Sequence, residues 1–142
     1  MTVQQAERTD SVRVTLPSVG HVILKASNHG VVDVQFWRVE RAASRWADGY
    51  VSFYPAAARN LGEALITGTS DVFTDVGEDL LGVSPIADGA ELEFAPTSER
   101  LQCIATPGKP ATVEMSRGFA ALIGHEVQRL ADRADVLSCW RH

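Results

Sequence analysis

Two sets of polar side chains in this sequence have the types and spacing to bind a charged or aromatic partner. The first set combines positive charge with flat rings. On alternating segments it holds Arg13, Lys25, Trp37, Tyr50 and Tyr54, and on the segment after Trp37 it adds Arg38, Arg41, Arg45 and Trp46. Cationic side chains follow a phosphate backbone, and bases stack on aromatic rings. This combination favours binding of single-stranded nucleic acid, with a regulatory rather than a catalytic role.

The aromatic residues of this first set also have a purely structural interpretation. Trp37 and the tyrosines could cover a second layer of the core, with Trp37 packed against Trp46, or they could form the seam of a dimer. Both interpretations stay open from the sequence.

The second set is acidic and lies in the other half of the chain. Strict alternation puts Glu91, Glu93 and Glu114 on one face of their strands, where they would repel phosphate. A solvated face accounts for them. The alternative is electrostatic docking of a basic protein, including another copy of this chain, which would make the protein a chaperone-like or inhibitory binding module.

Metal binding and catalysis find little support in the residue pattern. Cys103, Cys139, His125 and His142 are residue types that bind zinc, but their spacing is not that of a closed zinc site. The chain has no nucleophile elbow and no phosphate-binding glycine loop. We therefore predict a protein that is not an enzyme, with no catalytic residue, metal or cofactor.

The elements that carry the first set are predicted from hydrophobic alternation. Segments 11–16, 21–26 and 31–37 alternate apolar and polar residues and are separated by short turns, which predicts an antiparallel meander. A fourth strand over 50–54 leads into a helix from Pro55 to about Ile66, which Gly68 can end. A short helix is expected between them, over 38–48.

The second half ends on a strand that runs directly into a long amphipathic helix, within 111–134. Ser116 stands at the expected N-cap, and residues 135–142 form a tail. Before it, strands are expected over 80–84, 91–95 and 101–106. The segment 69–89 is acidic and broken by glycine and proline, which indicates a connector.

The two strand-into-helix segments are copies of one another. When Val51 is set against Val113, the apolar positions coincide, and Gly62 falls on Gly124. Glycine inside a helix costs about 1 kcal/mol against alanine, so this pair predicts a close approach of the helix to another helix or to a sheet. The fold class expected is α+β, with two ββββα units whose antiparallel curved sheets are each covered on one face by a helix. The expected division is a flexible terminus (1–10), a first unit (11–68), the connector (69–89) and a second unit with its tail (90–142), all in one compact domain.

Two successive ββββα units resemble the plan of the PUR-repeat and Whirly single-stranded nucleic-acid-binding proteins, and the single-repeat PC4-like coactivators are similar. The residues that carry the resemblance are GYVSFYPAAARNLGEAL and ATVEMSRGFAALIGHEV, with the hairpins before them. The resemblance is one of topology and hydrophobic pattern, and the lysine-rich strand of the Whirly proteins has no counterpart here. It implies that sheet surfaces bind single strands and that helices pair the units.

Composition sets the remaining expectations. The 142 residues carry a net charge of −5, but residues 1–60 hold seven basic against five acidic residues, and residues 61–142 hold six against thirteen. Nucleic-acid binding is therefore expected only from the first sheet. The chain opens on no signal-peptide pattern and has no membrane-length apolar run, so a cytoplasmic protein without membrane contact is expected. Small residues Ala120, Ala121 and Gly124 beside the stripe of the last helix predict a homodimer.

Overall fold

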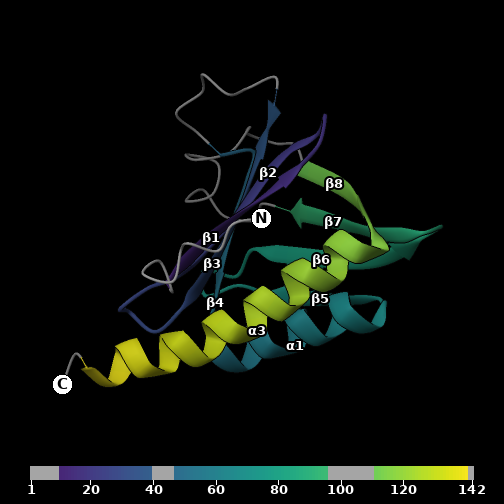
Figure 1. The fold of residues 1–142 in the computed structure, drawn as a ribbon. Coiled ribbons are helices and arrows are strands. Elements are labelled where there is room, and N and C mark those ends of the chain that lie inside the picture. The colour runs from purple at the N-terminus through teal and green to yellow at the C-terminus, as the bar shows by residue number, and fades with distance from the viewer. Residues whose placement is uncertain (1–9, 40–46, 96–110, 141–142) are drawn as a thin grey trace.

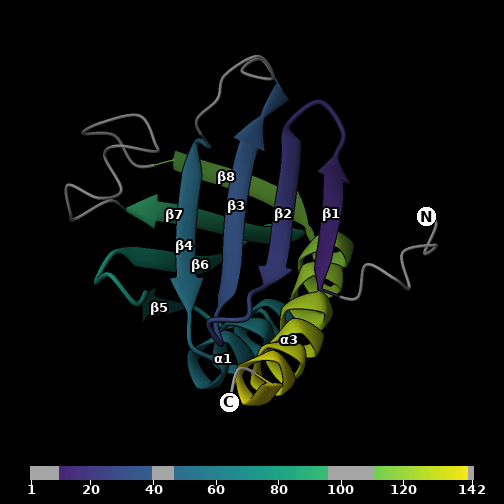
Figure 2. The same cartoon turned by 90° about the vertical axis from the view of Figure 1, so that its left-hand side faces the viewer.

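The structure is a computed structural model that describes residues 10–39, 47–95 and 111–140 of the chain. The described residues form two four-stranded antiparallel sheets and two helices that lie side by side (Figure 1). The sheets stand one behind the other with their strands running in crossing directions, and the helices lie along one end of both (Figure 2).

The first unit runs in the order that its alternation predicts. Its strands are β1 (Ser11–Leu16), β2 (Gly20–Ala26), β3 (Val32–Arg38) and β4 (Gly49–Phe53), which pair in chain order. Helix α1 (Pro55–Thr67) begins on proline and ends at Gly68, whose φ of 76° is the left-handed conformation that glycine adopts without strain. The helix therefore begins and ends on the two residues expected.

The second unit repeats this order with β5 (Asp71–Thr74), β6 (Leu80–Ile86), β7 (Gly89–Ala95), β8 (Ala111–Ser116) and helix α3 (Arg117–Trp140). At the start of α3, the Ser116 Oγ accepts a hydrogen bond from the Phe119 N–H at 3.2 Å, which is the N-cap contact expected of it. Two ββββα units in an α+β chain are thus confirmed.

Two of the expected boundaries were wrong, and two expected elements lie wholly or partly outside the described residues. The segment 69–89 is not a connector, because it holds all of β5 and β6, so the second unit begins at Asp71 rather than at residue 90. The strand expected over 80–84 is confirmed as part of β6. The expected tail is helical, because α3 continues to Trp140. The strand expected over 101–106, and residues 40–46 of the short helix expected over 38–48, lie outside the described residues. The other residues of that expected helix are not α-helical, and Arg38 is the last residue of β3.

The units are interleaved, because each helix packs on the sheet of the other unit. Helix α3 contacts β1, β2 and β3 of the first sheet, and α1 contacts β5 and β6 of the second. The inner faces of the two sheets also meet, where the Phe36 and Phe94 rings stack at 6.5 Å between centroids. Because the core is shared in this way, neither unit can bury its apolar face alone.

The helices α1 and α3 run antiparallel and close together. A Cβ placed on Gly62 would lie 2.7 Å from the carbonyl oxygen of Gly124, so the two glycines mark the closest approach of the helices. At one end of this contact the Arg117 guanidinium donates to the Leu65 carbonyl, and at the other Arg59 pairs with Asp132 at 3.0 Å. The close approach expected of the glycine pair is thus a helix–helix contact within one chain.

Candidate functional site

The outer face of the first sheet is open and carries most of the basic and aromatic side chains predicted for a ligand. Inward residues of β1 to β4 are buried apart from the half-buried Val12 and Arg38 at strand ends, and outward ones are exposed or half-buried apart from the buried Ser52, which confirms the alternation. The strand register arranges the outward side chains in three rows across the sheet. These rows are Thr15, His21 and Trp37; then Arg13, Ile23, Gln35 and Tyr50; then Ser11, Lys25, Asp33 and Ser52.

The first row holds two aromatic rings, those of His21 and Trp37, and contacts within the protein fix their orientation. The Trp37 indole Nε1–H donates to the Gln35 Oε1 at 2.9 Å, and the His21 ring lies nearly parallel to the indole, 6.4 Å away between centroids. Burial and the neighbouring positive charge of Arg13 lower the pKa of His21 below 6.5, which favours the neutral imidazole. Trp37 is half-buried, so part of its ring faces solvent.

The other two rows add charge. Arg13 and Lys25 are exposed, and Tyr50 is half-buried beside them. The Asp33 carboxylate accepts a hydrogen bond from the Ser52 Oγ at 2.5 Å. Burial raises the pKa of Asp33, although the bond from Ser52 and the charges of Lys25 and His29 act in the opposite direction.

Two of the predicted site residues lie off the three rows. Arg38 is engaged within the chain, because its backbone N–H donates to the Asp48 carboxylate at 2.8 Å and its guanidinium lies 3.8 Å from the same group and above the Phe36 ring. Tyr54 follows the last residue of β4 and stands at the N-cap of α1, with 62% of its surface exposed. Arg41, Arg45 and Trp46 lie outside the described residues.

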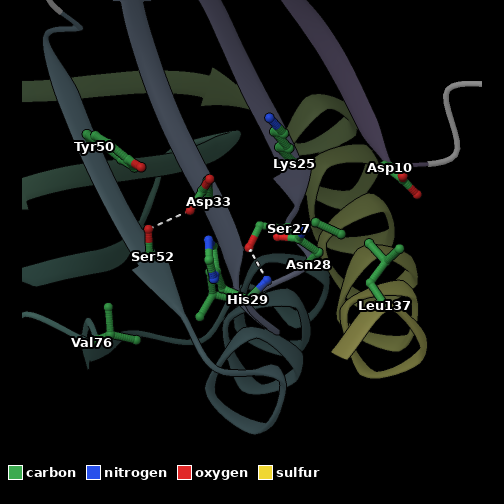
Figure 3. A pocket seen from close by; sticks show the side chains of 12 residues that line it. Asp10, Lys25, Ser27, Asn28, His29, Asp33, Tyr50, Ser52, Val76 and Leu137 are labelled. Atoms are coloured by element: carbon green, nitrogen blue, oxygen red, sulfur yellow. Dashed lines mark hydrogen bonds between the residues drawn. The ribbon is translucent and has the colours of Figure 1, made fainter. Parts of the chain in front are cut away.

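Sequence reasoning missed a hollow of about 760 Å³ at the third row (Figure 3). Lys25, Asp33, Tyr50 and Ser52 line it from the sheet. Its other sides come from the β2–β3 turn with His29, from Val76 after β5, from Asp10 and from Leu137 of α3. No local pattern brings these segments together, and the only signal in the sequence is a polar turn, Ser27 to Gly30, next to the outward Lys25.

The outer face of the second sheet is acidic, as alternation predicts. Glu91 of β7 and Glu114 of β8 are directly opposite one another in register, and Glu93 lies one outward position further along β7, opposite Thr112. Glu93 and Glu114 are exposed, and Glu91 is half-buried. No basic residue stands at an outward position of β5 to β8, so this face presents negative charge without compensation from its own strands.

The described residues give no support to a zinc site. Among them, no group of three or more His, Cys, Asp and Glu side chains is arranged to hold a metal ion. Cys139 and His125 are exposed on α3, and Cys103 and His142 lie outside the described residues. In the same part of the chain, neither helix is long and apolar enough to span a membrane.

Comparisons with protein-family models, with curated proteins and with solved structures found no match to this chain.

Proposed function

We propose that this protein binds single-stranded nucleic acid on the outer face of its first sheet. The observation that carries the proposal is the mixture of side chains on one open surface, where the His21–Trp37 pair and Tyr50 lie among the exposed cations Arg13 and Lys25. Neighbouring strands of a sheet lie about 4.8 Å apart, so a cation and a ring one strand away can contact the phosphate and the base of one nucleotide.

The charge distribution supports the same face over the other. The outer face of the second sheet bears Glu91, Glu93 and Glu114, which would repel a phosphate backbone. A strand bound to the first sheet would therefore stay on that sheet. A protein that occupies a single strand without changing it would act as a regulator, and we propose this role in the cytoplasm.

A fluorescence-anisotropy titration with a labelled single-stranded oligonucleotide tests the proposal at two salt concentrations. Binding that rests on phosphate contacts must weaken as salt rises, with a log–log slope of about −0.7 per neutralised phosphate. Replacing both Arg13 and Lys25 by alanine should lower the affinity and flatten this slope by about one to two.

A matched control is Arg129→Ala. Arg129 is an exposed arginine of α3 that pairs with Glu126 at 2.8 Å, away from the open face. The control variant should bind like the wild type. Absence of binding at low salt, or an equal loss in the control variant, contradicts the proposal.

The acidic face of the second sheet supports a second candidate function, docking of a basic protein. Like charges directly opposite one another on neighbouring strands are destabilising, as for Glu91 and Glu114, and a cationic partner would relieve this repulsion. A lysine-rich peptide titrated by calorimetry tests this candidate. Binding should be lost when Glu91, Glu93 and Glu114 are all changed to glutamine, and binding that is unchanged in this variant would count against it.

We also propose that the protein self-associates, through a surface other than the small residues of α3. Gly124 of α3 meets α1 within the chain and Ala120 is fully buried, so these two residues do not offer a free helix surface, and only Ala121 of the three is half-buried. The open face of the first sheet is a further surface for a dimer seam. Light scattering with and without oligonucleotide tests it, because a dimer that uses this face should dissociate as the strand binds.

A further inference from the structure

The open face of the first sheet is closed at one end. The last turns of α3 extend beyond the outer surface of this sheet, below the ends of β2 and β3 (Figures 1 and 2). Leu137 of α3 and Val76 stand on two sides of the hollow at the third row, with the β2–β3 turn between them (Figure 3). A ligand that lies along the strands from Trp37 towards Lys25 therefore meets a wall.

Direct contacts hold this wall in position. A Cβ placed on Gly30 of the β2–β3 turn would lie 3.2 Å from the Ser138 Cβ of α3, so the turn packs on the helix. Arg133 of α3 pairs with Asp10, just before β1, at 2.6 Å. On the other side, the Val76 N–H donates to the Ser52 carbonyl at 2.9 Å, which fixes the loop after β5 to the edge of β4.

The hollow contains an acceptor and a cation side by side. Lys25 and Asp33 are directly opposite in register on β2 and β3, yet among the described residues they do not form an ion pair within 4.0 Å. The Asp33 carboxylate is oriented by the Ser52 Oγ at 2.5 Å, and Tyr50 stands one row away on β4. The volume of about 760 Å³ lies in the range of roughly 300–1,000 Å³ that small-molecule sites occupy, enough for one nucleoside.

We propose that this hollow receives the end of a single strand and that Asp33 accepts a hydrogen bond from its terminal sugar hydroxyl. The proposal rests on the proposed function, since it needs a strand on the open face. In this arrangement Lys25 pairs with the last phosphate between two nucleotides, and Tyr50 stacks on the terminal base. Hydrogen bonds to an ionised carboxylate are among the stronger ones in proteins.

A free hydroxyl suits the hollow better than a terminal phosphate does. The Asp33 carboxylate would repel a phosphate at the same position. Asp10 also lines the hollow, but Arg133 offsets its charge. The last turns of α3 bring the negative end of the helix dipole to the same wall. Lys25, the cation opposite Asp33 in register, is occupied by the preceding phosphate in this arrangement.

The test compares five oligonucleotides of one sequence by anisotropy titration of the wild-type protein. Four are linear and carry either a hydroxyl or a phosphate at the 3′ end and at the 5′ end, and the fifth is circular. A phosphate at the end that enters the hollow should weaken binding about tenfold, because it replaces a charge-assisted hydrogen bond by repulsion. A phosphate at the other end should have little effect, and the circle should bind like the blocked strand.

The variant Asp33→Asn tests whether Asp33 is the residue that distinguishes a terminal hydroxyl from a terminal phosphate. The amide keeps the shape of the side chain and removes the charge, so the variant should lose most of the preference for the free hydroxyl. Asp71→Asn, at an exposed aspartate on β5, is the matched control and should keep the preference. A melting curve of each variant checks that it is folded.

The outcomes separate this inference from the proposed function. Equal affinity for all five oligonucleotides, with clear binding, overturns the end-recognition site and leaves strand binding intact. A preference that Asp33→Asn retains overturns the role of Asp33. Absence of binding to any of the five overturns both proposals.

Discussion

Gly62 of α1 and Gly124 of α3 face one another where the two helices are closest. A Cβ added to either residue would lie 2.7 Å from the carbonyl oxygen of the other, closer than real Cβ atoms approach an oxygen. The contact is reciprocal because the two residues occupy equivalent positions in the two units. Glycine costs a helix about 1 kcal/mol against alanine at each site, and the close packing of the helices offsets this cost.

We expect Gly62→Ala and Gly124→Ala each to destabilise the protein. The methyl group meets backbone on the facing helix, so the helices must separate, and overpacking of this kind costs about 1–3 kcal/mol. The gain in helix propensity is smaller than this cost. Chemical denaturation monitored by circular dichroism measures the free energy of unfolding of each variant.

Gly118→Ala is the matched control, because Gly118 lies in the first turn of α3 and an added Cβ would come no closer than 3.9 Å to the Ser116 Oγ. It should be as stable as the wild type or slightly more stable. If Gly124→Ala behaved like Gly118→Ala, the helix contact would not limit the size of the side chain.

The repeat made this pair predictable before the structure. Alternation places residues on the two faces of a strand and predicts β1 to β4, β6 to β8 and the start of α1. The alignment of Val51 with Val113 then carries Gly62 onto Gly124. The same alternation predicts the face that carries Arg13, Lys25, Trp37 and Tyr50. The strands and their faces depend on residues near in sequence, and the glycine pair depends on the repeat.

The features that the sequence did not predict depend on contacts between distant segments. Asp71, Asp75 and Asp79 gave 69–89 the composition of a connector, and only the strand over 80–84, which is part of β6, was expected there. The strand β5 was missed, and Asp75 satisfies the turn that joins it to β6. Arg38 was predicted to contact the ligand, but its backbone N–H donates a hydrogen bond to Asp48, ten residues later in the chain. The hollow at Lys25 needs α3 to cross the first sheet, and no local pattern indicates that each helix packs on the other unit.

Asp75 is a buried carboxylate that joins the two units. Its Oδ2 accepts a hydrogen bond from the Ser52 N–H at 3.1 Å, and its Oδ1 accepts from the N–H groups of Gly77 at 2.6 Å and Asp79 at 3.0 Å. Asp75→Ala leaves these donors without their acceptor and should cost roughly 2–4 kcal/mol of unfolding free energy. Asp71→Ala, which removes an exposed acceptor for the Val72 N–H, should change the free energy of unfolding far less. Equal effects in denaturant titrations would show that Asp75 is not a structural anchor.

Asp33 should make stability depend on pH in a defined direction. Its folded pKa is raised above the ordinary value of 3.8, mainly by burial. The folded state therefore holds the proton more tightly than the unfolded chain does, and this contribution to stability is lost as pH rises from 3.8 through the folded pKa. Asp33→Asn has no such loss, so its melting temperature minus that of the wild type should grow with pH across this window.

Ser52→Ala provides a second check on the same carboxyl group. The hydrogen bond from the Ser52 Oγ opposes the effect of burial on the pKa of Asp33, so removing the hydroxyl should raise that pKa further. The loss of stability with rising pH should then be steeper than in the wild type. Melting temperatures measured from pH 4 to pH 7 test both variants. If the melting temperature of Asp33→Asn minus that of the wild type fell as pH rose, the expected direction of the pH dependence would be contradicted.

Trp37→Ala separates the binding role of this residue from a structural one. The indole is half-buried and held by Gln35 and His21 on the open face, so its loss should cost less than the roughly 3–5 kcal/mol of a fully buried aromatic truncation. Stacking of a base on an aromatic ring contributes about 1–3 kcal/mol, so the affinity for single strands should fall about tenfold or more. Thermal melting and one anisotropy titration of this variant measure the two effects. A large fall in melting temperature with unchanged affinity would make Trp37 a core residue and remove the ring on which the proposed binding face depends.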